Sequence, residues 1–216
     1  MDNDWKVVSL LFTEKHMEVH KISEEHARVD YELGRVKSKQ PIRSPDSSAN
    51  IIMYFSLPEQ YLGNRITSYG GFLRYKLHNT LESGRSDSTG IVAADLVLSG
   101  NNLTIIHEHI EQPTIEEPFV FTTKLTEREF RHLNGHDVSR EQMMMVLVRL
   151  ESIYIRGTYF EPISEVYVDN VLLDKAVEGR RLQDAPRSLT VEQCNCPPNY
   201  RGTSCEVWLL FSRFDH

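Results

Sequence analysis

The clearest hydrophobic pattern lies in residues 51–78, where two strand-like runs flank a turn-rich connector. Residues 51–57 (IIMYFSL) are largely apolar at both sets of alternate positions, which is typical of a strand in the middle of a sheet. Pro58 cannot donate a ladder hydrogen bond and ends this run. Residues 73–78 alternate strictly between apolar and basic side chains, which predicts a half-solvated antiparallel strand. Glycines in the connector, at Gly63 and at Gly70-Gly71, predict a compact loop that folds back.

Shorter alternating runs continue this pattern along the chain. Residues 4–12 predict a first strand, and two weaker, charged runs at 17–22 and 27–33 are expected near a sheet edge, where charges discourage unwanted pairing. A turn at residues 99–102 predicts a hairpin. The remaining strands are expected at 91–98, 103–110, 119–124, 152–160 and 165–173. The residues expected on their inner faces are Phe119, Phe121, Ile153, Ile155 and Tyr159.

The hydrophobic period becomes helical at residues 139–150. The segment SREQ (139–142) matches a capping box, and apolar residues then recur at helical spacing from Met143 to Leu150. A second match, TERE (126–129), predicts another helix start. Many short strands with one or two short capping helices favour an all-β antiparallel sandwich that is closed at one end by a helix.

The exact amino-acid sequences of two of these segments are more informative than their periodicity. YFSLPEQYLGNRITSYGGFLRYKL (54–77) resembles the laminin IV type A domain of laminin alpha and gamma chains and of perlecan, and SREQMMMVLVRLESIYIRGTYF (139–160) resembles that family's second signature. The resemblance covers about residues 5–176 and implies a jelly-roll-like antiparallel β-sandwich similar to carbohydrate-binding modules. The residues that carry the first motif are Tyr54, Phe55, Pro58, Leu62, Gly63, Asn64, Ser68, Tyr69, Gly70 and Gly71.

Length and charge limit the remaining function classes. The 216 residues fit one large domain with a small appendage, and a net charge of -7 without a basic block argues against nucleic-acid binding. No apolar run reaches the roughly 18 residues of a transmembrane helix. The start MDNDW is acidic where a signal peptide would be basic, so we expect a secreted form of this chain to derive from a longer protein.

Candidate chemistry is sparse. His107 and His109 could contribute to a zinc or copper site if a third ligand lay nearby, but a solvated strand face opposite Ile106 and Ile110 explains the same pattern. His132 and His136 have a helical i,i+4 spacing, yet Gly135 between them is expected to end that helix. No nucleophile, zinc-protease or phosphate-loop motif occurs, and no carboxylate pair is placed for acid–base work. We therefore expect no catalytic residues, no metal site and no cofactor.

The three cysteines, Cys194, Cys196 and Cys205, lie in one short segment, and their odd number leaves at least one thiol without an internal partner. CNCPPNYRGTSCE (194–206) resembles the later half of a laminin EGF-like repeat, within which the laminin family carries its domain IV. That resemblance implies a Cys196–Cys205 disulfide and a free Cys194, whose family partner lies in the other half of the repeat. The expected organisation is a laminin IV type A domain at 1–186, a partial EGF-like repeat at 187–206 and an atypical tail at 207–216.

One modification motif is present. Asn102-Leu103-Thr104 is the only Asn-x-Ser/Thr sequon, and it lies at the predicted hairpin turn. If the chain is secreted, Asn102 is expected to carry an N-linked glycan.

The family resemblance implies a non-enzymatic structural module of a secreted laminin chain, most similar to an alpha chain, located in the extracellular matrix of basement membranes. Its partners would be other laminin chains and basement-membrane components. The alternative is a carbohydrate-binding module, suggested by the aromatic residues Tyr54, Tyr61, Tyr69 and Phe72 near one loop. Burial of these rings would favour the structural module, for which we expect Tyr54, Phe55, Tyr69, Leu73 and Tyr75 to share one core.

Overall fold

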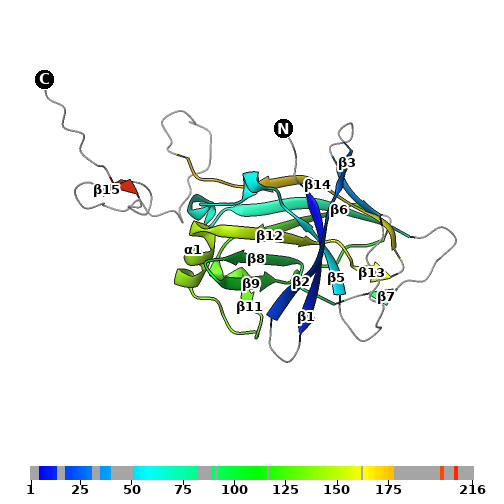
Figure 1. Cartoon of the computed structure of the whole chain (residues 1–216), viewed down its shortest axis with the longest axis horizontal. Helices are drawn as coiled ribbons and strands as arrows, with labels where there is room; N and C mark the ends of the chain where they lie inside the picture. Colours follow the sequence, from blue (N-terminus) through cyan, green and yellow to red (C-terminus); the bar gives the residue numbers. More distant parts are fainter. Residues whose placement is uncertain are drawn as a thin grey trace, which may run out of the picture.

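The computed structural model describes residues 5–13, 18–30, 35–39, 51–81, 89–90, 92–115, 117–161, 163–177, 200–201 and 207–208. Two antiparallel sheets face one another and form a sandwich, which confirms the predicted all-β class (Figure 1). One α-helix closes an end of it.

The larger sheet has seven strands in the order β11–β9–β8–β12–β5–β1–β2. Strand β5 lies between β12 and β1, which confirms the prediction of a central strand, and β2 lies at the edge, as predicted for the charged run that follows the first strand. The strand bounds are β1 Lys6–Thr13, β2 Glu18–His26, β5 Ile51–Ser56, β8 Leu96–Gly100, β9 Leu103–His107, β11 Arg131–His132 and β12 Leu150–Arg156.

The smaller of the two sheets has five strands in the order β10–β6–β14–β4–β3. Its strands are β3 Arg28–Asp30, β4 Arg35–Lys39, β6 Phe72–Leu81, β10 Phe119–Lys124 and β14 Ile163–Leu173. Two short pairs complete the described β structure. Strand β7 (Thr89–Gly90) pairs with β13 (Phe160–Glu161), and β15 (Tyr200–Arg201) pairs with β16 (Val207–Trp208).

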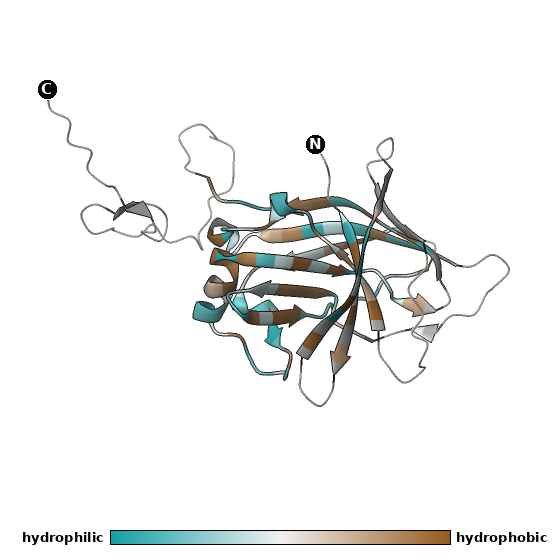
Figure 2. Cartoon of the chain, in the orientation of Figure 1, coloured by the Kyte–Doolittle hydropathy of each residue, from teal (hydrophilic) through white to brown (hydrophobic). Residues whose placement is uncertain are grey.

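The main core lies between the two large sheets, where apolar side chains from both meet. Figure 2 shows that hydrophobic residues recur along the strands of the sandwich. Phe55 from β5 and Tyr75 from β6 are both almost completely buried there. Four of the five predicted inner residues, Phe121, Ile153, Ile155 and Tyr159, are also buried, whereas Phe119 at the start of β10 is only partly covered.

A second apolar cluster lies on the other face of the seven-stranded sheet and includes Val8, Ile52, Tyr54 and Val97. The expectation that Tyr54 shares a core with Phe55 is therefore wrong. Successive side chains of a strand point to opposite faces, so Phe55 enters the sandwich and Tyr54 leaves it. The Tyr54 hydroxyl donates to the carbonyl of Ala94 at 2.7 Å, which satisfies its polar atom in this buried position.

The connector between β5 and β6 is compact, as predicted, and contains two 3₁₀ helices, η1 (Glu59–Tyr61) and η2 (Ile66–Ser68). Gly63 and Gly70 have φ values of +85° and +76°, a region that residues with a Cβ rarely adopt. Their amides donate to the carbonyls of Leu150 and Leu125, each at 2.9 Å. The connector is thus attached both to the strand after the helix and to the segment after β10.

Helix α1 (Arg140–Val148) begins at the predicted capping box. The Ser139 hydroxyl accepts from the Gln142 amide, and the Gln142 side chain accepts from the Ser139 amide. The other predicted capping box is wrong, because η3 (Glu127–Glu129) is a single 3₁₀ turn with no side-chain cap at Thr126. The Glu127 carboxylate instead accepts a hydrogen bond from the Tyr69 hydroxyl at 2.6 Å.

Strand boundaries differ from the sequence prediction around β8 and β9. The run predicted at 91–98 begins as a strand only at Leu96, and the run predicted at 103–110 ends at His107. Asn101 and Asn102 have φ values of +49° and +58° and form the predicted hairpin turn. The strands are shorter because, at the open end of the hairpin, the His109 amide donates to the Asp95 carboxylate and not to a backbone carbonyl of β8.

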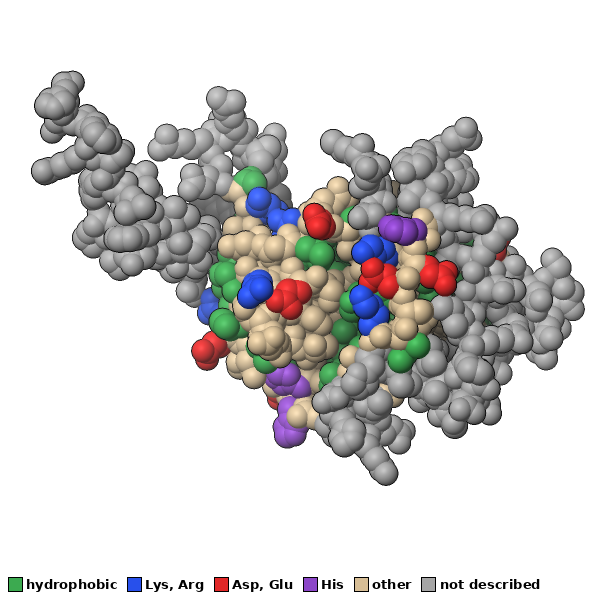
Figure 3. Space-filling view, viewed as in Figure 1, with side chains coloured by type: hydrophobic (Ala, Val, Ile, Leu, Met, Phe, Trp, Pro, Cys, Tyr) green, Lys and Arg blue, Asp and Glu red, His purple; other side chains and the backbone are tan. Residues whose placement is uncertain are grey.

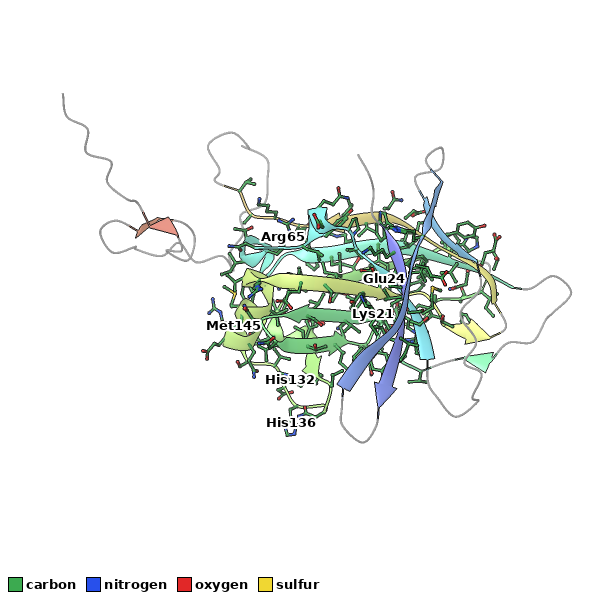
Figure 4. The ribbon with its side chains drawn as sticks, in the orientation of Figure 1. Lys21, Glu24, Arg65, His132, His136 and Met145 are labelled. Atoms are coloured by element: carbon green, nitrogen blue, oxygen red, sulfur yellow. The ribbon has the colours of Figure 1, made fainter. Side chains whose placement is uncertain are left out.

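The edge strand β2 carries paired charges. Glu24 interacts with Lys21 on the same strand and with Lys6 of β1, the latter at 2.7 Å (Figure 4). Hydrogen bonds from Lys21 and Lys6 lower the pKa of Glu24 to about 2, so the carboxylate stays ionised at neutral pH. Such a charged edge is a poor template for another strand.

Candidate functional site

A buried ion pair lies at the end of the sandwich opposite the hairpin turn. Asp95, just before β8, and Arg156, the last residue of β12, are both at most 1% exposed, with 3.5 Å between Oδ1 and Nη1. The Arg156 amide donates to the Asp95 carbonyl at 2.9 Å, so backbone pairing brings the two side chains together. Burial of charges is costly unless they are paired and hydrogen-bonded, and this pair has further partners.

The Arg156 guanidinium connects two segments that lie outside the strands. Nε donates to the Thr158 carbonyl and Nη1 to the Ala93 carbonyl, both at 2.8 Å. The charged group also lies 4.2 Å from the ring centre of Tyr159, within the range of a cation–π contact. Arg156 therefore holds the segment before β8 and the segment after β12 against the core.

His109 supplies the main hydrogen bonds to Asp95. Its amide donates to Asp95 Oδ2 at 2.6 Å, and its Nε2 lies 2.8 Å from the Thr123 hydroxyl of β10. Burial opposes ionisation of Asp95, but the hydrogen bonds from His109 outweigh that effect and lower its pKa. The cluster thus joins the two sheets, since Thr123 belongs to the five-stranded sheet and Asp95 directly precedes β8 of the seven-stranded sheet.

The expectation that His107 and His109 lie on a solvated face is wrong. His107 is 8% exposed and follows the buried Ile105 at the next inward position of β9. The strand ends there and the alternation stops, so that Ile110, predicted to point inward, is fully exposed. The two imidazoles lie with ring centres 4.4 Å apart, and His107 Nδ1 bonds to the Glu129 carbonyl.

Burial lowers the pKa of His107, so the ring is neutral at physiological pH. Nδ1 then donates to the carbonyl of Glu129, and Nε2 is buried without a hydrogen-bond partner. Within the described residues, no three His, Cys, Asp or Glu side chains are arranged to hold a metal ion. The hydroxyls of Tyr75 and Tyr159 are also buried, and burial raises the pKa of both well above the usual value.

A groove runs beside this cluster, with a volume of about 980 Å³. It lies between β10, the segment that follows β9, and the region around η3 and β11. Its lining combines apolar side chains such as Ile110 and Val120 with the charged Glu108 and Arg128. Sequence reasoning did not find this groove, because it forms where edge strands of the two sheets come together.

The other histidine pair does not share a helix. His132 belongs to β11, and its amide donates to the His136 carbonyl at 2.9 Å across a turn in which Gly135 has a φ of +80° (Figure 4). The helix that was expected to end at Gly135 is absent from this described segment. His132 Nε2 lies 3.1 Å from the Gln142 side-chain oxygen and so links this turn to α1.

The four aromatic residues considered for sugar binding do not form an exposed platform. Tyr54 and Tyr69 are buried, and Tyr61 is partly buried against Trp5, with its hydroxyl donating to the Val171 carbonyl at 3.0 Å. Phe72 is partly buried beneath the guanidinium of Arg74, which lies 4.7 Å from its ring centre. Sugar stacking needs accessible ring faces, so this arrangement favours a packing role for these residues.

The predicted glycosylation site belongs to the described residues, whereas the three cysteines do not. Asn102 is exposed at the β8–β9 turn, near the helical end of the sandwich. Cys194, Cys196 and Cys205 lie outside the described residues. In the part of the chain that the structure describes, no helix has the length and apolar character of a membrane span. Figure 3 shows basic, acidic and histidine side chains scattered over the visible face without one dominant charge.

Comparison with known proteins gives a consistent assignment. The family model of Laminin B (Domain IV) matches residues 54–192. A laminin subunit alpha of Drosophila melanogaster is 35% identical over 86% of this chain and 5% of its own length. The basement membrane-specific heparan sulfate proteoglycan core protein of Mus musculus is 32% identical over 71% of this chain and 4% of its own length.

The fold has a solved counterpart. The L4b domain of human laminin alpha-2 superposes with a TM-score of 0.57 at 17% sequence identity, covering 77% of this chain and 90% of that chain. The chain spans only 4 to 5% of the length of the curated relatives named above. Since the family model matches more than half of its residues, the chain belongs to the Laminin B (Domain IV) family.

Proposed function

We propose that the chain is a non-enzymatic structural domain of a secreted basement-membrane protein, of the laminin or basement-membrane proteoglycan type. The observation that carries this proposal is the family match over residues 54–192, together with relatives named as laminin alpha subunits and basement membrane proteoglycans. The buried Asp95–Arg156 pair supports a structural role, because both side chains serve to connect strand ends. Other laminin chains and matrix components would be the partners of the parent protein.

We further propose that residues 187–206 are the later half of a laminin EGF-like repeat and that the domain is inserted within that repeat. The spacing of Cys194, Cys196 and Cys205 supports this proposal, with Cys196 bonded to Cys205 and Cys194 left for the other half of the repeat. The short β15–β16 pair joins Tyr200 to Trp208 across the last cysteine. Closing a loop of about ten residues would contribute roughly 2.7 kcal/mol on the chain-entropy model.

A domain exchange tests the structural role. This chain would replace the domain IV of a laminin alpha short arm, with secretion from mammalian cells and electron microscopy of the purified arm as measurements. A structural domain should allow secretion and appear as a globule on the rod. Retention of the chimera inside the cell, while the parent arm is secreted, would contradict the proposal.

The cysteine proposal has its own measurement. Peptide mapping of the oxidised chain should join Cys196 to Cys205, and thiol titration should find one reactive group. A Cys194–Cys205 bridge, or three free thiols under oxidising conditions, would overturn it.

The carbohydrate-binding alternative is not favoured by any observed feature, since two of its four rings are buried and the other two are partly covered. A glycan array on which binding saturates, and is lost on substitution of Tyr61 or Phe72, would restore that alternative.

A further inference from the structure

Strand β10 forms one edge of the five-stranded sheet and has a regular backbone. It pairs with β6 on one side from Phe119↔Leu77 to Lys124↔Phe72 without a register shift, and no other described strand pairs with it. The strand contains neither proline nor a bulge. Proteins often use a proline or a bulge to make an edge strand unsuitable for pairing. Because β10 has neither, its free edge is open to another strand.

The residue that follows β10 shows which of its backbone groups face β6 and which face the free edge. Leu125 directs both of its backbone groups toward the β6 side, because its amide donates to the Gly71 carbonyl and its carbonyl accepts from the Gly70 amide, each at 2.9 Å. Backbone groups alternate in direction along a strand. Those of Phe121 therefore face β6, and those of Val120 and Thr122 face away from it. Phe72 agrees with this phase, since its carbonyl accepts from Asp174 on the β14 side.

The outward-facing groups open onto the groove described above. Val120 and Thr122 both line it, and its volume of about 980 Å³ leaves room for an extended segment along the strand. Two apolar side chains at this groove are exposed to solvent, Val120 at 62% and Ile110 at 101%. A bound strand would thus find both backbone partners and apolar contacts.

The charges around the groove have an acidic surplus. Arg131 is already paired with Asp137, and Arg128 is close enough to Glu127 to help lower its pKa. The lining acids Glu108, Glu111 and Glu129 are exposed, and no ion pair of theirs is found among the described residues. A basic partner therefore complements this groove better than an acidic one.

We propose that β10 accepts an extended segment of a partner protein, with alternating apolar and basic side chains, as an added strand. Backbone hydrogen bonds to Val120 and Thr122 supply the pairing, the exposed Val120 and Ile110 supply apolar contact, and Glu108, Glu111 and Glu129 attract the basic side chains. This is the strand-addition mode of peptide recognition. The proposal goes beyond the structural role and does not depend on it.

The test uses a capped, fluorescently labelled peptide of alternating valine and lysine, with the full chain as receptor and anisotropy as readout. A peptide of alternating valine and glutamate, and a valine–lysine peptide N-methylated at alternate amides, are the controls. Only the unmethylated basic peptide should bind saturably, and its affinity should fall with added salt. Absence of binding, or equal binding of the methylated peptide, would overturn the proposal.

Two receptor variants locate the site. Val120→Pro removes an amide on the free edge and leaves the β6 ladder intact, so it should weaken binding by about tenfold or more. Met145→Ala changes an exposed apolar side chain of α1 that does not line the groove, and this variant should bind like the parent. If Val120→Pro does not fold, the combined variant Glu108→Gln, Glu111→Gln and Glu129→Gln replaces it and should weaken binding and reduce the salt dependence. Unchanged binding by the variant that folds would refute the site. Sedimentation showing that the chain dimerises through β10 would instead identify a second copy as the occupant.

Discussion

Replacing Arg156 by methionine removes one partner of the buried ion pair and should strongly lower the free energy of unfolding. Methionine fills much of the space of the arginine stem but cannot donate to the Thr158 and Ala93 carbonyls. It also leaves Asp95 buried without its cationic neighbour. Removing one partner of a buried ion pair costs about 3–5 kcal/mol, and this range includes the loss of donors for buried carbonyls.

Urea unfolding monitored by tryptophan fluorescence measures this cost. With an m-value of about 2 kcal/mol per molar urea, a loss of 3–5 kcal/mol lowers the midpoint by roughly 1.5–2.5 M. The matched control is Arg149→Met, since Arg149 is 73% exposed and lies 3.3 Å from Glu151. An exposed pair contributes about 0–1 kcal/mol, so this variant should unfold close to the parent.

A double variant separates the charge from the packing. If the uncompensated carboxylate causes most of the loss, Asp95→Asn combined with Arg156→Met should cost less than the sum of the two single changes, by about 1–3 kcal/mol. Equal urea midpoints for Arg156→Met and Arg149→Met would refute the conclusion that the buried network stabilises the sandwich.

Three further predictions concern the core, the histidine pair and the hairpin turn. Phe55→Ala should lower the free energy of unfolding by about 3–5 kcal/mol, and Met145→Ala on the exposed face of α1 by less than about 0.5 kcal/mol, both measured by urea unfolding. Because burial lowers the pKa of folded His107 below 6.5, the unfolded chain takes up more protons in mild acid, and stability should fall as pH decreases below about 6.5. Thermal melts between about pH 7.5 and 5.5 should show a smaller loss for His107→Gln, and an equal loss would contradict this assignment. On protein secreted from mammalian cells, an N-glycosidase should reduce the mass and Asn102→Gln should abolish that change, whereas an unchanged parent mass would refute glycosylation at Asn102.

The sequence alone determined the strands in which the alternation of side chains is clear from neighbouring residues. Residues 51–56 and 73–78 lie in strands because their alternation matches a pleated backbone, and residues 119–124 were predicted with the observed bounds of β10. The capping box at Ser139 formed because both of its partners lie within one helical turn. Glycines of the connector likewise stand where the backbone needs positive φ. Each of these features depends on residues close together in the chain.

Only the tertiary structure decided the features that depend on distant residues. His107 and His109 look like one solvated face in the sequence, but β9 ends at His107, and the amide of His109 then donates to the carboxylate of Asp95, which lies just before β8. Tyr54 and Phe55 are adjacent in the chain and belong to different apolar clusters, since the sheet separates them. The groove beside β10 is invisible in the sequence because it forms between the edges of two sheets. Local periodicity specifies which side chains share a face, whereas pairing across long sequence separations decides what covers that face.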